Sequence, residues 1–199
     1  MSKILNNYYF LQFDEYLHKQ LKEKFGTLVI FFVLMLYPGS GNKTFGAFFI
    51  IIFSILSDIK NKRLDLLTFL PYSRKNIFWF EFAFTSLLIL LSFFIGLPYY
   101  RSFQNFLVDI ATAMIFYSAY YGLSIALTCG LKIDPYGSIF LVLLVDAILS
   151  SLGKEGVKHL YNPYKLISPL RQGNMLLSFV FAVICIYLGY IAFSKKGAD

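Results

Sequence analysis

Apolar runs long enough to cross a lipid bilayer, separated by short charged loops, are the feature that most constrains this sequence. The runs extend from Phe25 to Ser194. An α-helix needs about 20 residues to cross the hydrocarbon core, because it rises 1.5 Å per residue. Only 15% of the residues are charged and 58% are hydrophobic, whereas soluble domains average roughly 25% charged residues. We therefore predict an all-α integral membrane protein whose residues 1–199 form a single transmembrane domain.

We predict six transmembrane helices. Two lie within residues 25–57, three within 76–152 (at 76–97, 105–130 and 135–152), and the sixth within 174–199, which ends in a short tail. The second apolar run, from Thr44 to Ser57, is short. It reaches full length only if Lys43 extends its ammonium group to the membrane surface and the helix continues past Asp58. A re-entrant hairpin over residues 25–57 is the alternative.

Residues 1–24 carry the period of an amphipathic helix. Phe10, Phe13, Leu17 and Leu21 recur at steps of three and four residues, with charged side chains between them. This spacing places the apolar side chains on one helix face. We predict an interfacial elbow helix that lies along the membrane before the chain enters it. A solvated N-terminal helix is the alternative, and no cleavable signal peptide is predicted.

The distribution of Lys and Arg predicts the orientation. If six helices alternate in direction, twelve of the eighteen basic residues fall on the side of the N-terminus and six on the other. Because basic loops are retained in the cytoplasm, both termini are predicted to be cytoplasmic in a cell-membrane protein. The loop 153–173 then lies outside, and its apolar residues around Pro163 and Pro169 favour a segment seated on the membrane. The net charge of +7 lies in short clusters beside apolar runs, so no nucleic-acid surface is predicted.

No catalytic or metal-binding constellation is visible. His18 and His159 are far apart, and Cys129 and Cys185 lie in different apolar runs. These spacings exclude a disulfide framework and a CxxC metal site. No nucleophile stands at a recognisable spacing from a base, so we predict that the chain itself is not an enzyme.

Two acidic residues, Glu81 and Asp146, lie within predicted spans. Charges in the membrane are costly, so such residues either line a path or bond to neighbouring helices. For both we favour the second role, and for Glu81 the candidate partners are Lys60, Lys62 or another basic group near the inner membrane surface. The fourth predicted span carries four aromatic residues, for which helix packing is favoured over substrate binding: Phe116, Tyr117, Tyr120 and Tyr121.

The segment 58–75, between the second and third predicted spans, differs from the other loops. It carries five of the eighteen basic residues, at positions 60, 62, 63, 74 and 75. Between the two basic groups, residues 64–70 form a leucine-rich stretch that ends at Pro71. Proline disfavours helix in the residue before it, so a short amphipathic helix is predicted to end near Leu70.

This segment resembles the permease subunits of the ABC-2 type of ABC transporter. The resemblance lies in the signature Leu70-Pro71-Tyr72-Ser73-Arg74, in the leucines that precede it, and in Asp58, where the charged stretch begins. The predicted elbow helix, six spans and outer segment before the last span are also similar to that family. Where the family often has a lysine early in the third span, this chain has Glu81.

The resemblance implies that residues 58–75 form a cytoplasmic coupling helix that docks on an ATP-hydrolysing subunit. It assigns this contact to ten residues: Asp58, Arg63, Leu64, Asp65, Leu66, Leu67, Leu70, Pro71, Ser73 and Arg74. It further implies two copies of the ATPase, a second permease subunit in a homodimer or heterodimer, and surrounding membrane lipid. This chain would bind no cofactor, with ATP and magnesium on the partner ATPase.

Such a chain would serve an ATP-driven exporter. Two other classes of function remain open from the residues alone. One is an intramembrane enzyme, either a protease or a lipid-modifying enzyme. The other is a substrate-binding membrane subunit or a channel.

Overall fold

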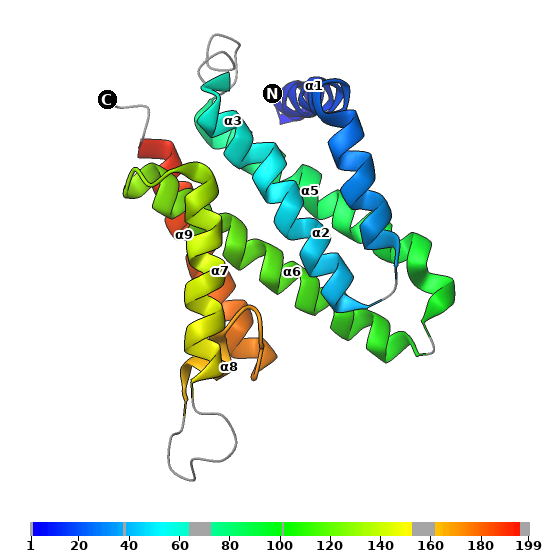
Figure 1. Cartoon of the computed structure of the whole chain (residues 1–199). Coiled ribbons are helices and arrows are strands. Elements are labelled where there is room, and N and C mark those ends of the chain that lie inside the picture. The colour runs from blue at the N-terminus through cyan, green and yellow to red at the C-terminus, as the bar shows by residue number, and fades with distance from the viewer. Residues whose placement is uncertain (1, 38, 64–72, 101, 153–161, 196–199) are drawn as a thin grey trace.

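The computed structural model describes residues 2–37, 39–63, 73–100, 102–152 and 162–195, with side chains described from Leu11 onward. Within these ranges every regular element is a helix (Figure 1). The all-α prediction is therefore confirmed for the part of the chain that the structure describes.

The helices follow the predicted apolar runs closely, with short π or 3-10 segments continuing three of them. In chain order they are α1 (Ser2–Leu36), α2 (Ser40–Ile51), the π segment η1 (Ile52–Leu56), α3 (Ser57–Lys60), α5 (Arg74–Gly96), the 3-10 segment η2 (Leu97–Tyr99), α6 (Phe103–Ile125), the π segment η3 (Ala126–Gly130), α7 (Pro135–Ser151), α8 (Tyr164–Ile167) and α9 (Met175–Lys195).

Four of these helical stretches are long and apolar enough to cross a membrane: Ser40–Lys60, Arg74–Tyr99, Phe103–Gly130 and Met175–Lys195. They indicate a multi-pass membrane protein. Helix α7 is apolar but has only 17 residues, and the apolar part of α1 begins only after Lys24. Four of the six predicted spans are therefore long and apolar enough to cross a membrane. The apolar parts of α1 and α7 are shorter.

Successive long helices run in alternating directions in Figure 1. The second half of α1, then α2–α3, α5, α6, α7 and α9 pass back and forth across the molecule. The Ser2 end of α1, the Lys60 end of α3 and the Lys195 end of α9 lie at one end, whereas α8 lies at the opposite end. The ribbon of α1 also changes direction sharply along its length, although the helix is continuous from Ser2 to Leu36.

The largest contact between two helices joins α6 to α9. Two glycines make this close approach possible. A Cβ on Gly122 would overlap the carbonyl group of Cys185, and one on Gly189 would lie 2.6 Å from the carbonyl oxygen of Gly122. Small residues at such contacts let two helix backbones approach closely in a membrane.

Aromatic side chains of α6 fill the centre of the bundle, as the sequence predicted. Phe116, Tyr117, Tyr120 and Tyr121 are all buried, and the rings of Phe116 and Tyr120 stack with centroids 4.0 Å apart. The hydroxyl of Tyr121 donates a hydrogen bond to the carbonyl oxygen of Phe78 at 2.8 Å. These contacts confirm packing as the role of the aromatic group. Both cysteines are buried, and neither forms a disulfide.

The stripe of α1 that packs against the bundle is not the apolar face identified in the sequence. Leu21 is exposed, whereas Gln12, Tyr16, Gln20 and Lys24 are buried. These four residues follow one another at steps of four, so they lie along a single stripe of the helix. The helix therefore packs against the bundle with a largely polar stripe. Hydrogen bonds to neighbouring helices offset the free-energy cost of burying these polar side chains.

The environment of Lys43 also differs from the prediction. Its helix does begin at Ser40 and does continue past Asp58, as a full-length span requires. However, the Lys43 ammonium does not extend to the surface, because the residue is fully buried. It donates to the carbonyl oxygens of Met35 and Ser92, the latter at 2.8 Å, and lies 4.6 Å from the centroid of the Phe93 ring.

Candidate functional site

A buried ion pair joins α1 to the start of the segment 58–75. The ammonium nitrogen of Lys24 lies 2.8 Å from Oδ2 of Asp58, and both side chains are buried. The same ammonium donates a hydrogen bond to the carbonyl oxygen of Ser54 at 3.0 Å. Asp58, assigned to the predicted coupling contact, is therefore held by the last turn of the proposed elbow region.

Glu81 belongs to the same buried cluster. The hydroxyls of Tyr16 and Ser54 each donate a hydrogen bond to one of its two carboxyl oxygens. The amide of Gln20 donates to the Tyr16 hydroxyl at 2.8 Å and to Oδ2 of Asp58 at 3.3 Å. Residues from α1, η1, α3 and α5 thus meet at one place, which we call the α1 polar cluster: Tyr16, Gln20, Lys24, Ser54, Asp58 and Glu81.

Of the basic groups considered for Glu81, Lys60 is not its partner, whereas Lys24 lies close enough to interact with it electrostatically. Lys60 instead lies 3.3 Å from Asp134, and the groups that contact Glu81 are the hydroxyls of Tyr16 and Ser54. Burial raises the pKa of Tyr16 well above its ordinary value, and the nearby Glu81 raises it further. The phenol therefore keeps its proton and remains a hydrogen-bond donor at neutral pH.

Helix α1 also contacts residues on both sides of the leucine-rich stretch. Glu23 lies 3.8 Å from Arg63, before the leucine-rich stretch, and Gln12 accepts a hydrogen bond from Asn76, after it, at 3.3 Å. Ser73 caps α5 by accepting the backbone N–H of Asn76 at 3.2 Å. Both ends of the segment are therefore attached to α1.

The middle of the predicted coupling contact lies outside the described residues. This applies to Leu64, Asp65, Leu66, Leu67, Leu70 and Pro71. Of the other assigned residues, Asp58 is buried, Arg74 is partly buried as the first residue of α5, and Arg63 and Ser73 are exposed.

Asp146 forms a second buried centre, near the opposite end of the molecule. Oδ1 accepts hydrogen bonds from the hydroxyls of Tyr164 at 2.9 Å and Ser168 at 2.7 Å. Oδ2 accepts from the Tyr120 hydroxyl at 2.9 Å and the backbone N–H of Leu170 at 3.1 Å. A carboxylate that accepts this many bonds tolerates burial. This supports the structural role expected for Asp146, which fastens the segment after α7 to α6 and α7.

We expect Asp146→Asn to loosen the segment 162–174 while leaving α2 and α5 in place. An amide keeps one acceptor oxygen for the four donors around it, and each unsatisfied buried donor costs about 1–3 kcal/mol. Hydrogen exchange should speed up at the amide of Leu170. Ser151→Ala, which removes an exposed hydroxyl about one and a half helical turns away, is the control. Unchanged exchange at Leu170 in the Asp146 variant would contradict this role.

Glu81 and Asp146 do not form one site. Glu81 bonds to α1 and η1, whereas Asp146 bonds to α6, α8 and the turn that follows α8. Figure 1 places α8 at the end of the molecule opposite to α3. In addition, the described residues contain no group of three or more His, Cys, Asp or Glu side chains that could hold a metal ion. A paired-carboxylate intramembrane enzyme would need these groups together, so this geometry disfavours that alternative.

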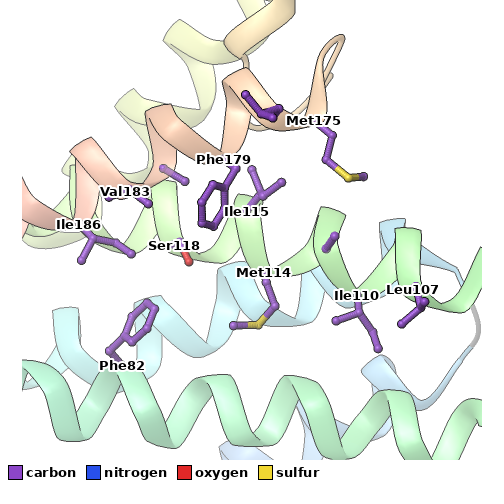
Figure 2. A pocket seen from close by; sticks show the side chains of 13 residues that line it. Phe82, Leu107, Ile110, Met114, Ile115, Ser118, Met175, Phe179, Val183 and Ile186 are labelled. Atoms are coloured by element: carbon purple, nitrogen blue, oxygen red, sulfur yellow. The ribbon is translucent and has the colours of Figure 1, made fainter.

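An apolar groove of about 750 Å³ opens between α5, α6 and α9 (Figure 2). Phe82 lies on one side, Met114 and Ile115 on the middle helix, and Phe179 and Val183 on the third. Ser118 is the polar residue among the side chains drawn there. The groove suits an apolar chain.

The sequence interpretation missed Tyr16, Gln20, Lys24 and Ser54 as partners of the acidic residues. A signal was present for the first three, because their steps of four residues place them on one helix face. Ser54 carried no comparable signal, because it lies in an apolar run.

Comparisons of the chain with models of known protein families, with curated proteins and with solved structures find no match.

Proposed function

We propose that this chain is the permease subunit of an ATP-driven exporter of the ABC-2 type. In this proposal it crosses the cell membrane six times with both termini in the cytoplasm. Residues 1–24 act as an elbow helix, 58–75 as the coupling segment and 153–173 as an outer segment seated on the membrane. Two copies of a separate ATPase hydrolyse ATP with magnesium, and a second permease subunit completes the translocation path.

The attachment of α1 to both ends of the coupling segment is the observation that carries this proposal. Lys24 holds Asp58 and Glu23 lies near Arg63 before the leucine-rich stretch, and Gln12 bonds to Asn76 after it. A buried ion pair with added hydrogen bonds is stiff, because breaking it exposes an uncompensated charge to a low-dielectric surrounding. A force applied to the segment would therefore move α1, α2–α3 and α5 together, as a coupling device requires.

The positions of the chain ends also support the proposed topology. The Ser2 end of α1, the Lys60 end of α3 and the Lys195 end of α9 lie on the same side of the molecule. Both ends of the coupling segment lie on this side as well. An ATPase bound there would meet the elbow helix and the coupling segment on one face. Five of the eighteen basic residues fall in the coupling segment, as expected for a cytoplasmic loop.

We expect Leu67→Asp or Arg74→Glu to leave the permease folded and to abolish stimulation of the ATPase. Placing a charge in a small apolar contact, or reversing one at its rim, should weaken binding by roughly tenfold or more. Copurification with the ATPase and stimulated ATP hydrolysis are the two measurements. Arg171→Glu reverses an exposed charge on the far side of the molecule and should retain both.

Two results would contradict the proposal. One is full stimulation by both coupling variants. The other is topology: if single cysteines at positions 63 and 74 react with impermeant reagents only from the side away from ATP, no ATPase reaches this segment.

A further inference from the structure

A pocket with a basic rim and an apolar floor lies where α3, α5, η3, α7 and α9 converge. It has a volume of about 460 Å³. Its charged lining consists of four basic residues, Lys60, Lys62, Arg74 and Lys132, and one acidic residue, Asp134. We propose that this pocket binds the phosphate headgroup of an anionic membrane phospholipid, with the start of its acyl chains against the apolar floor.

The charges of two basic residues in the pocket, Lys62 and Lys132, are not balanced by the described residues. Asp134 is already engaged, because it pairs with Lys60 at 3.3 Å and accepts the backbone N–H groups of Tyr136 and Gly137. These N–H bonds, chiefly that of Gly137, and the nearby Lys60 lower the pKa of Asp134, so it stays ionised. Among the residues described, Lys62 and Lys132 have no acidic side chain within ion-pair distance. An anion is therefore the complementary ligand.

Helix dipoles explain only part of this gathering of positive charge. Lys62 and Lys132 follow the C-terminal ends of α3 and η3, where a cation is favourable. Both have a φ of 56°, a left-handed conformation that favours glycine or asparagine at this place. Arg74, by contrast, is the first residue of α5, at the helix end where a cation is unfavourable and an anion is favourable. An anion in the pocket would lie near this end of α5 and would pair with the ammonium groups of Lys62 and Lys132.

The floor of the pocket favours a lipid over free phosphate. Ile59, Cys129, Ile133 and Phe193 line it beneath the charged groups. Phe193 is buried near the end of α9, one of the helices long and apolar enough to cross the membrane, so an apolar group attached to the bound anion would meet apolar side chains at the floor. Basic pockets between transmembrane helices at the bilayer surface bind anionic lipid headgroups in this way.

The chain contains a single tryptophan, and it provides a reporter for the acyl chains. Trp79 is exposed on α5, about one and a half turns from Arg74. Its ring lies 5.8 Å from that of Tyr190 on α9, and its neighbour Phe78 contacts Phe193 of the pocket floor at 5.9 Å. A lipid seated in the pocket would therefore place its acyl chains beside Trp79.

The test uses the whole chain in mixed bilayers that contain phosphatidylglycerol and phosphatidylcholine, with bromines on the acyl chains of one lipid at a time. We expect brominated phosphatidylglycerol to quench Trp79 in preference to brominated phosphatidylcholine. Each basic group near the surface contributes about fivefold in affinity for an anionic lipid. Lys62→Gln/Lys132→Gln should therefore lower this preference by roughly tenfold or more. Lys22→Gln/Lys75→Gln removes two exposed charges that do not line the pocket and should keep the preference.

Several results would overturn the proposal. Equal quenching by both lipids in the native protein would show that the pocket does not select an anionic lipid. An equal loss of lipid preference in the two double variants would show that the preference comes from the general surface charge and not from the pocket. Displacement of the bound lipid by millimolar inorganic phosphate would identify free phosphate as the ligand. If the pocket variant keeps its lipid preference but no longer copurifies with the ATPase, the pocket is a protein-docking surface instead.

Discussion

Replacing Lys24 with methionine is expected to destabilise the protein by about 3–5 kcal/mol, the usual cost of removing one partner from a buried ion pair. The Lys24 ammonium lies 2.8 Å from Asp58, in a cluster that also holds Glu81. Methionine fills a similar volume but leaves two buried acidic side chains without this cation. The free energy of unfolding in mixed detergent micelles, or the thermal transition of the purified protein, provides the measurement.

Two further variants make this prediction specific to the ion pair. Lys22→Met removes an exposed charge from the same helix and should change stability by no more than about 0.5 kcal/mol. Lys24→Met/Asp58→Asn removes both charges of the pair and should recover more than half of the lost stability, because no uncompensated Asp58 carboxylate remains. If Lys24→Met is as stable as Lys22→Met, the ion pair does not hold α1 to the bundle.

Replacing Gly122 with alanine is expected to cost at least the 1–3 kcal/mol typical of overpacking. A single methyl group at this position would overlap the carbonyl group of Cys185 and lie 2.6 Å from the backbone nitrogen of Ile186. The obstructing atoms belong to the backbone of α9, so no side chain can rotate away. The two helices with the largest mutual contact would have to separate along their length. The thermal transition and the yield of monodisperse protein should both fall.

Gly26→Ala provides a matched control for this substitution. Gly26 lies in the interior of helix α1 and has no atom within 4 Å of the position that a Cβ would occupy. Alanine is the better helix former there, so stability should rise by about 0.5–1 kcal/mol. Equal effects of the two glycine substitutions would show that α6 and α9 do not depend on their close approach.

The sequence predicted the helical segments well because each depends on local properties. Apolar runs and their proline or glycine boundaries gave the third predicted span at 76–97, where α5 and η2 occupy Arg74–Tyr99. Burial of the α6 aromatics also followed from composition and helical spacing. The continuous path of α2 past Asp58 was expected as well, because an apolar run needs that length to cross a bilayer.

Partners within the bundle were not predictable from such local rules. The sequence left Glu81 a choice among several basic residues, and the structure pairs it with two hydroxyls. It placed Lys43 at the surface, whereas the lysine is buried against two backbone carbonyls and an aromatic ring. For α1 it identified an apolar face, although the stripe that contacts the bundle is polar. Each case depends on which residues of distant segments lie at the same depth.

By itself, the sequence determined the class of the protein, an apolar helical chain with a basic, leucine-rich segment between two spans, whereas the functional hypothesis came from the resemblance of that segment to a known family. Periodicity and hydropathy are sufficient for this, because they record how each segment meets lipid or water. Tertiary structure alone decided that Lys24, Asp58, Tyr16 and Glu81 share one buried cluster and that four basic residues surround one pocket. The free energy of a charged group is set by its neighbours in space, and these come from segments far apart in the chain.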